Sequence, residues 1–316
     1  MPQATFTVNP ELSAIAMVYS NPAVALIADQ VLPRRITAET FKYTKYDKSL
    51  AYTVPDTRVG RKSAPNLVEF EGSEETASCV DFGLDSPVPN RDMKVFNDMP
   101  KAGGAKSPLE VATMFTTQLV QLDREIRVAK LVFNAGTYVT GQKEKLTGQD
   151  QFSDFDNSDP LGYVMEKLDV PLIRPNVIVI GQEVWTKLRT HPAIVNACKG
   201  TAQNAGVVAR QQVAELFEVS QILVGAGRMN TARKGQLPNF QRCWGKHMAM
   251  LYIDGLAAQA DQPCFGFTGQ WGDKVAGTIT DPDMGLDGGI RVRVGERVVE
   301  VISAADCGFF VEDAVA

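Results

Sequence analysis

The sequence of 316 residues lacks several features that would point directly to a membrane or nucleic-acid function. It contains no run of about 18 apolar residues, so no membrane-spanning helix is expected. Residues 1–10 show no basic stretch followed by an apolar one, so no secretory signal is expected. Positive charge is not in excess, because 32 Lys and Arg face 37 Asp and Glu, giving a net charge of −5. Tight binding to nucleic acid needs concentrated Lys and Arg, which argues against that class.

Cysteine and histidine are both scarce. The closest two of the five cysteines, Cys243 and Cys264, stand 21 residues apart, so the chain has no CxxC zinc or redox motif. His191 and His247 are the only histidines, which excludes a histidine-rich metal site. His191 precedes a proline at a predicted helix start, and His247 begins an apolar strand, so a structural role is predicted for each. We therefore expect no catalytic residues, no cofactor site and no metal site.

Two short stretches imitate ligand-binding motifs, but each lacks an essential residue. Residues 225–230 begin like a dinucleotide fingerprint, yet Asn230 stands where the third glycine belongs. Residues 281–285 begin like a calcium loop, yet Gly285 occupies a position that needs Asp or Asn. Plain turns are the better interpretation of both. A nucleotide-binding α/β enzyme using residues 225–230 stays open as an alternative from another functional class.

Residues 34–85 carry the most unusual charge pattern of the chain. Residues 34–62 hold 8 basic and 3 acidic side chains, whereas residues 69–85 hold 6 acidic and no basic ones. Apolar and polar residues alternate in both parts, which predicts a long β-hairpin with one basic and one acidic leg. An isolated two-stranded ribbon is marginal in water, so this hairpin is expected to rest on other protein. The candidate intersubunit residues are Arg58, Arg61, Lys62, Glu69, Glu71, Glu74 and Glu75. Alternatively, these charges pair within the hairpin.

A long helix is predicted over residues 107–134. Ser107, Pro108 and Glu110 form a capping box with proline at the first helical position. Apolar residues then recur every three or four positions, which predicts one buried face or, alternatively, a coiled-coil seam. The residues of this stripe are Val111, Phe115, Leu119, Leu122, Ile126, Ala129 and Phe133.

The remaining pattern is mixed helix and strand. Residues 86–106 are rich in Pro and Gly and are predicted to be a loop. Residues 290–302 alternate on both sides of Gly295-Glu296, which predicts a hairpin turning there. The other predicted elements are strands at 177–180, 221–224 and 247–254 and helices at 182–189, 191–198 and 206–218.

The succession of these elements resembles the major capsid proteins of tailed bacteriophages, which have the Hong Kong 97-type fold. No single motif carries the resemblance, which extends over most of the chain. The stretches that carry it are residues 9–12 with 27–33, 34–85, 107–134, 174–192, 216–232, 244–252 and 265–268.

The resemblance implies an α+β fold with an N-terminal arm, an extended hairpin called the E-loop, a peripheral domain and an axial domain. The implied division is residues 1–33 for the arm, 34–85 for the E-loop, 86–165 for the peripheral domain with its spine helix, 166–264 for the axial domain, 265–300 for return strands of the peripheral domain and 301–316 for a C-terminal segment in the axial domain.

The resemblance also implies a function without catalysis. Members of the family form pentamers and hexamers that tile an icosahedral shell around packaged double-stranded DNA, inside a host bacterium. The main partner is then the chain itself, with weak contact to DNA and none to a membrane. Portal and decoration proteins are further candidate partners, and a scaffold is expected to be separate or absent. An encapsulin-type compartment shell is the alternative with a similar fold. Residues 1–85 are expected to become ordered only against neighbouring copies.

Overall fold

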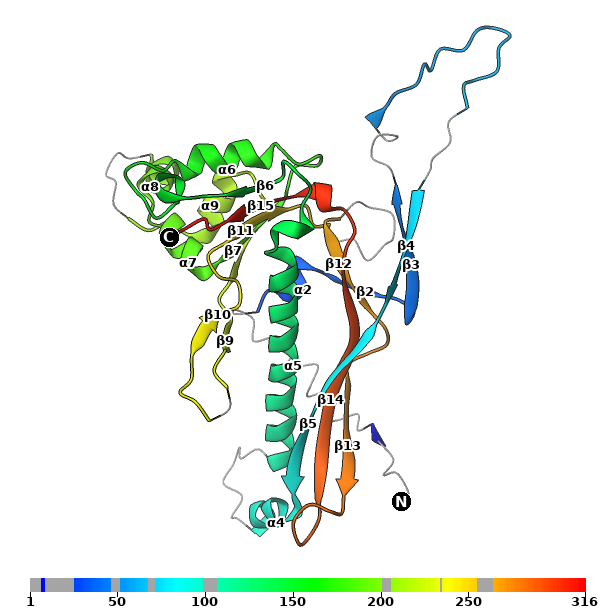
Figure 1. Ribbon diagram of the computed structural model, residues 1–316, viewed down its shortest axis with the longest axis vertical. Helices are drawn as coiled ribbons and strands as arrows, with labels where there is room; N and C mark the ends of the chain where they lie inside the picture. The colour runs from blue at the N-terminus through cyan, green and yellow to red at the C-terminus, as the bar shows by residue number, and fades with distance from the viewer. Residues whose placement is uncertain are drawn as a thin grey trace.

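The computed structural model describes residues 7–8, 26–46, 52–67, 72–98, 107–200, 206–233, 235–254 and 264–316. Figure 1 shows an elongated molecule in which one long helix, α5, runs from a compact part with several helices along an extended sheet. A two-stranded hairpin leaves the body on the side away from the helices. In the described part of the chain, no helix is both long and apolar enough to cross a membrane.

A five-stranded sheet forms the centre of the compact part. Its strand order is β6-β15-β11-β7-β8, with β7 and β8 parallel and β11 antiparallel to both β7 and β15. These strands are β6 (Lys143–Lys145), β7 (Val177–Gly181), β8 (Gln221–Gly225), β11 (Met248–Leu251) and β15 (Gly308–Glu312). The helices of this part are α6 (Pro160–Leu168), α7 (Gln182–Leu188), α8 (Pro192–Lys199) and α9 (Arg210–Leu216).

Strand β7 shows why this sheet forms the core. All five of its residues are buried, because protein covers both faces of the sheet. Ile178 and Ile180 pack in the cluster that includes α6 to α9, whereas Val177 and Val179 pack in a second cluster with α5. A continuous apolar run is therefore the expected sequence for this strand, and the sequence predicted it.

A six-stranded sheet forms the extended part. Its order is β1-β13-β14-β12-β2, and β5 also pairs with β14. The strands are β1 (Thr7–Val8), β2 (Arg34–Ile36), β5 (Val80–Pro89), β12 (Gly266–Gln270), β13 (Val275–Asp281) and β14 (Gly289–Ile302).

The predicted hairpin turn at Gly295-Glu296 is wrong. Strand β14 continues through both residues for 14 residues, and the chain turns instead at 282–288, before it. Gly295 lies opposite Gly83 of β5, and a Cβ on Gly295 would approach the Phe82 carbonyl oxygen to 2.8 Å. The glycine therefore permits close strand approach rather than a turn. The predicted turn at 281–285 is confirmed, with Gly285 at φ +62°.

Helix α5 (Pro108–Val132) confirms the predicted long helix and its cap. The Glu110 N–H donates to Ser107 Oγ at 3.2 Å, and the Ser107 N–H donates to Glu110 Oε2 at 2.9 Å. The predicted buried stripe is wrong for the first half of the helix, because Phe115 is 63% and Leu119 is 55% exposed.

The first half of α5 instead buries a threonine face. Thr113, Thr116 and Thr117 are buried, and each hydroxyl donates to a carbonyl oxygen one turn earlier on the helix. These internal bonds satisfy the hydroxyl groups, so small polar side chains can face the sheet without penalty. Apolar periodicity predicted the helix correctly but assigned the wrong side to the sheet.

The segment predicted as a loop over residues 86–106 holds more structure than expected. Strand β5 continues to Pro89, and helix α4 (Asn90–Asp98) follows directly. Residues 99–106 lie outside the described part. The later predictions are confirmed in kind, since α7, α8, α9, β7, β8 and β11 each fall within or next to a predicted segment.

The described parts of residues 1–36 lie on their own chain. Thr7 and Val8 pair with β13, and Ile27, Ala28, Val31 and Leu32 are buried. We call residues 26–36 the strap; they contain α2 (Ala28–Val31) and β2, and β2 pairs in parallel with β12. The expectation that this region becomes ordered only on neighbouring copies is wrong for the strap, because its apolar side chains find a site against α5.

Candidate assembly surfaces

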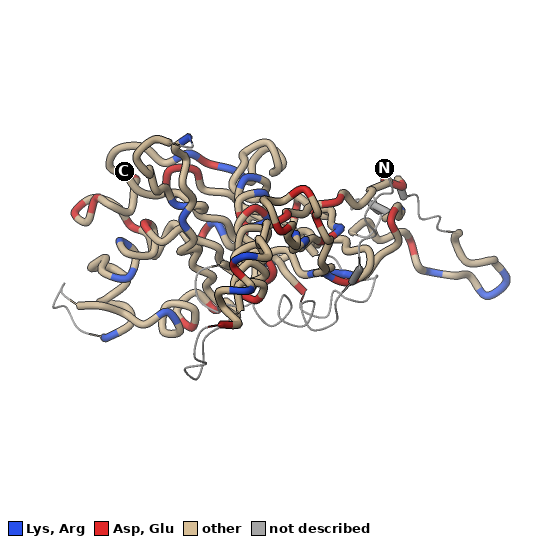
Figure 2. The backbone as a smooth tube through the Cα atoms, turned by 90° about the horizontal axis from the view of Figure 1, so that it is seen from below, with Lys and Arg blue, Asp and Glu red and all other residues tan. Residues whose placement is uncertain are grey.

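The hairpin divides into a stem and a tip. The stem is β3 (Thr40–Tyr46) paired with β4 (Gly72–Ser78), and the tip is residues 52–67. Figure 1 shows the tip extending away from the rest of the molecule. The tip exposes the side chains of Arg58, Arg61 and Lys62. Figure 2 shows basic residues at this projecting end of the molecule. Of the other predicted residues, Glu69 and Glu71 lie outside the described part.

The tip also exposes apolar side chains that the sequence analysis did not single out. Val54 is 83% and Leu67 is 87% exposed, and Tyr52 and Val59 are exposed as well. The turn is braced internally, because the Arg58 N–H donates to Asp56 Oδ1 at 3.0 Å and Asn66 Nδ2 donates to the Asp56 carbonyl oxygen at 2.7 Å. The tip is a projecting loop held by internal hydrogen bonds, and its exposed apolar and basic side chains are typical of a protein-binding surface.

Charges within the stem pair across its two strands. Lys42 Nζ lies 2.7 Å from Glu74 Oε2, and Tyr43 Oη donates to Glu75 Oε2 at 2.5 Å. Burial, with the nearby Glu75 carboxylate, raises the pKa of Tyr43 to about 12. The interpretation that charges pair within the hairpin therefore holds for Glu74, whereas Glu75 accepts a hydrogen bond from the neutral hydroxyl of Tyr43. It does not extend to Arg58, Arg61 and Lys62, whose side chains show no ion pair among the described residues.

The rest of the acidic leg faces the body. Asp85 accepts two hydrogen bonds from Arg293 of β14, at 2.7 and 2.8 Å, and these bonds lower the pKa of Asp85. Asp81 forms an ion pair with Arg297 at 3.2 Å. The acidic leg therefore has two parts. Strand β4 pairs with β3 in the stem, whereas β5 pairs with β14 and fixes the hairpin to the body.

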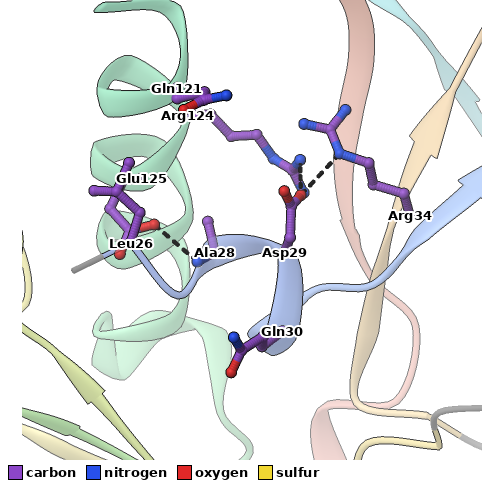
Figure 3. A pocket seen from close by; sticks show the side chains of 8 residues that line it. All are labelled: Leu26, Ala28, Asp29, Gln30, Arg34, Gln121, Arg124 and Glu125. Atoms are coloured by element: carbon purple, nitrogen blue, oxygen red, sulfur yellow. Dashed lines mark hydrogen bonds and ion pairs between the residues drawn. The ribbon is translucent and has the colours of Figure 1, made fainter. Parts of the chain in front are cut away.

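The strap is fixed to α5 by a fully buried carboxylate. Glu125 accepts the N–H groups of Ile27 and Ala28, each at 2.8 Å, and Trp244 Nε1 donates to it at 2.5 Å. Figure 3 shows Glu125 pointing from α5 to the start of α2. Burial raises the pKa of Glu125, although these three donors act in the opposite direction. The carboxylate joins three separate segments of the chain.

The neighbouring residue of α5 holds the end of α2. The Arg124 side chain is only 2% exposed, and its Nη2 donates to the Leu32 carbonyl oxygen at 3.3 Å and to Thr268 Oγ1 at 3.0 Å. It also pairs with Asp29, which lies between the guanidinium groups of Arg124 and Arg34 in Figure 3. A cavity of about 220 Å³ adjoins this network. Sequence periodicity gave no signal for these contacts, because Arg124 and Glu125 resemble ordinary surface charges of a helix.

The structure assigns structural roles to both histidines. His191 is buried at the start of α8, where its Nδ1 accepts from the Ala193 N–H at 3.2 Å, and burial lowers its pKa. His247 Nδ1 accepts from the Asp313 N–H at 3.0 Å, and burial lowers its pKa as well. Within the described ranges, no three His, Cys, Asp or Glu side chains gather in a metal-binding group.

The stretch that imitates a dinucleotide fingerprint is a turn. Gly225 ends β8, and the following residues enter the strand β9 (Arg228–Asn230) and not a helix. Strand β9 pairs with β10 (Phe240–Arg242) in a short hairpin. A Cβ on Gly225 would come within 2.0 Å of Trp244, so the glycine makes room for the indole ring. A phosphate-binding loop needs a helix to follow the strand, and here none does.

Comparison with solved structures defines the class of fold. A phage-related protein from Bordetella bronchiseptica aligns with a TM-score of 0.73 at 22% identity, covering 98% of each chain. The capsid protein of cyanophage P-SCSP1u aligns with a TM-score of 0.59 at 10% identity, covering 92% of this chain and 88% of the other. A virus-like particle protein from Pyrococcus furiosus aligns with a TM-score of 0.56 at 13% identity, covering 96% and 98%. The mixed helix-and-sheet fold is therefore that of capsid-forming proteins.

Sequence comparison gives the family. The chain is 48% identical to the major capsid protein of Pseudomonas phage JBD67 over 317 aligned positions, covering all of both chains. It is 26% identical to the major capsid protein of Burkholderia phage BcepMu, covering 83% of this chain and 82% of the other. No family model matches the sequence. The chain belongs to the phage major capsid proteins, and its role is structural and not enzymatic.

Proposed function

We propose that the chain builds the icosahedral head of a tailed phage through pentamers and hexamers, and that the hairpin of residues 34–85 is the E-loop that joins neighbouring subunits. The observation that carries this proposal is the tip. Residues 52–67 project from the body and expose Tyr52, Val54, Val59 and Leu67 together with three basic side chains. Such a surface gains its burial from another molecule, and in a shell that molecule is a second copy.

The remaining features fit the Hong Kong 97-type division. Helix α5 takes the part of the spine helix, the six-stranded sheet takes that of the peripheral domain, and the five-stranded sheet takes that of the axial domain. Strand β15 returns the C-terminal residues 301–316 to the axial sheet. Residues 1–33 would then form an arm that is anchored on its own subunit at the strap and extends elsewhere over other copies.

The proposal includes the contents and the other partners of the shell. With a net charge of −5, the chain would contact packaged double-stranded DNA weakly, which lets the DNA leave again. Portal, decoration and any scaffold proteins would be separate chains, and assembly would take place in the cytoplasm of the host bacterium. No observation favours a compartment shell around cargo enzymes over a phage head.

Replacing the tip tests the proposal directly. Tyr46 and Gly72 are paired across the stem, so an Asn-Gly turn can replace residues 47–71 and keep β3 and β4. We expect a folded subunit with an unchanged unfolding midpoint and no closed shells in electron microscopy or sedimentation. Normal shells from this variant would contradict the role given to the hairpin.

Two triple charge-reversal variants, one in the tip and one elsewhere on the surface, provide a second test with its matched control. Arg58→Glu, Arg61→Glu and Lys62→Glu together should abolish shells, because basic side chains at the tip meet an oppositely charged surface. Reversal of Lys130, Lys199 and Arg210, which are also exposed but lie elsewhere, should leave assembly intact. Equal loss of shells in both variants would show that net charge, and not the tip, decides assembly.

A further inference from the structure

The strap spans the junction of the two segments that the proposed function assigns to contacts between subunits, since it contains the end of the arm and the start of the hairpin. Its first residues lead back toward the N-terminal segment, and its last strand, β2, leads into β3 of the hairpin stem. Whatever holds the strap therefore determines where both segments leave the body. Glu125 holds the start of the strap and Arg124 holds Leu32, so adjacent residues of α5 fix both ends of α2.

A buried ion pair continues this network into the sheet. Arg34 of β2 lies 2.8 Å from Asp29 and 2.8 Å from Glu296 of β14, whose side chain is almost completely buried. The same strand β14 holds the acidic leg of the hairpin through β5. Arg34 and Glu296 thus tie one leg of the hairpin to the strand that carries the other leg.

The stem rests on the strand beside this pair. The Phe267 ring of β12 lies 6.0 Å from the Phe41 ring and 6.2 Å from the Tyr43 ring, and the Arg35 guanidinium covers it at 4.3 Å. A Cβ on Gly269 would come within 2.7 Å of Phe41, so the stem approaches the backbone of β12 closely. The direction of the stem is therefore set where β2 meets β12.

This region is unusual because its polar groups are incompletely satisfied. Six described side chains hold polar atoms that are shielded from solvent and have no hydrogen-bond partner, and four of these side chains surround the strap. They are Arg35, Gln121, Arg124 and Glu296. Buried polar groups nearly always have partners, and a partly satisfied network is costly. A buried charge network is weak evidence for stability, but it can fix a single arrangement of the segments that it joins.

We propose that Asp29, Arg34, Arg124, Glu125 and Glu296 form a joint that positions the hairpin for assembly. The first four lie around the cavity in Figure 3, and Glu296 binds Arg34 from the sheet. These are positioning residues, because the surfaces that meet the neighbour lie elsewhere. The inference rests on the proposed intersubunit role of the hairpin.

An apolar replacement separates positioning from stability. A buried ion pair can often be replaced by apolar residues of similar volume without loss of stability. In Arg34→Met with Glu296→Leu, the pair is removed and Asp29 remains paired with Arg124. We expect an unfolding midpoint within about 5 °C of the parent and a shell yield per folded subunit at least about tenfold lower. Arg34→Lys, which keeps the charge, should restore most of the yield. Normal shells from the apolar double variant would overturn the proposal.

Hydrogen exchange on the unmodified chain provides a test that does not depend on variant folding. The amides of Ile27 and Ala28 bind Glu125 in the subunit, so their protection reports the state of the joint. We expect these amides to exchange at least about tenfold more slowly than the amides of the tip in free subunits, because the joint is already formed there. Exchange of Ile27 and Ala28 as fast as that of the tip would overturn the joint. If the variant without a tip forms normal shells, the role of the hairpin itself fails instead.

Discussion

The five-stranded sheet and the region of the strap and hairpin bury their residues by different means. The sheet has apolar side chains on both faces, including Ile178, Ile180, Val177 and Val179 of one strand. The strap adds to its apolar contacts a set of buried charges on α5, β2 and β14, and the hairpin leaves its tip exposed. The first region is complete within one subunit, whereas the second leaves the apolar groups of its tip uncovered, which the proposed intersubunit role would explain.

The largest effect on folding is expected from the centre of the compact region. Phe310 of β15 is almost fully buried, and its ring lies 5.4 Å from Tyr138 and 5.9 Å from Phe133. Phe310→Ala should lower the free energy of unfolding by about 3–5 kcal/mol, because it removes an aromatic side chain from a packed cluster. Chemical denaturation of the purified subunit measures this. A loss below about 1 kcal/mol would show that the core can close around the cavity.

A smaller, pH-dependent effect is expected at the strap. Burial raises the pKa of Glu125, so its contribution to stability is fully present below the ordinary glutamate value and is lost as pH rises through the folded value. Glu125→Gln has no such group, so its stability relative to the parent should improve as pH rises from about 4 to about 7. Denaturation midpoints across that range measure the difference. A constant difference would show that Glu125 has no shifted pKa.

Asp29 gives the opposite sign and serves as the control for that series. Burial opposes its ionisation, but the guanidinium groups of Arg124 and Arg34 outweigh burial and lower its pKa. Its contribution is therefore present above the ordinary aspartate value and is lost as pH falls through the folded value. Asp29→Asn should consequently lose its difference from the parent at acidic pH, where Glu125→Gln behaves in the reverse manner.

The smallest effect is expected at the stem surface. Lys42 and Glu74 pair at 2.7 Å, but both side chains are mostly exposed, so solvent screens the attraction. Lys42→Ala should leave the unfolding midpoint of the subunit unchanged while the tip variants abolish assembly. Thermal unfolding measures the midpoint. A clear fall would show that the hairpin contributes to the stability of the subunit, which contradicts the contrast with the compact region.

Local patterns predicted local structure well. The capping box at Ser107, the buried run at β7 and the turn at Gly285 all follow from rules that act over a few residues. The charge asymmetry of residues 34–85 also indicated the segment that projects as a hairpin. The paired strands and the exposed basic tip lie within that segment.

The errors came from contacts between distant residues. Gly295 resembled a turn because nothing near it in the chain reveals that Gly83 lies opposite. Apolar periodicity assigns the exposed Phe115 and Leu119 to a buried stripe, because periodicity does not show which face of a helix meets the sheet. Arg124 and Glu125 gave no signal, since their partners in the strap are 92 or more residues away in the chain.

The sequence by itself determined the long capped helix, the apolar strands of the compact part and a charged hairpin without a core of its own. These features depend on periodicity, capping and composition, which act between near neighbours in the chain. Only the tertiary structure decided that the strap closes over α5, that buried charges hold it there, and that the acidic leg is shared between the stem and β14. The energy of a buried charge depends on partners brought together by folding, and no local pattern contains them.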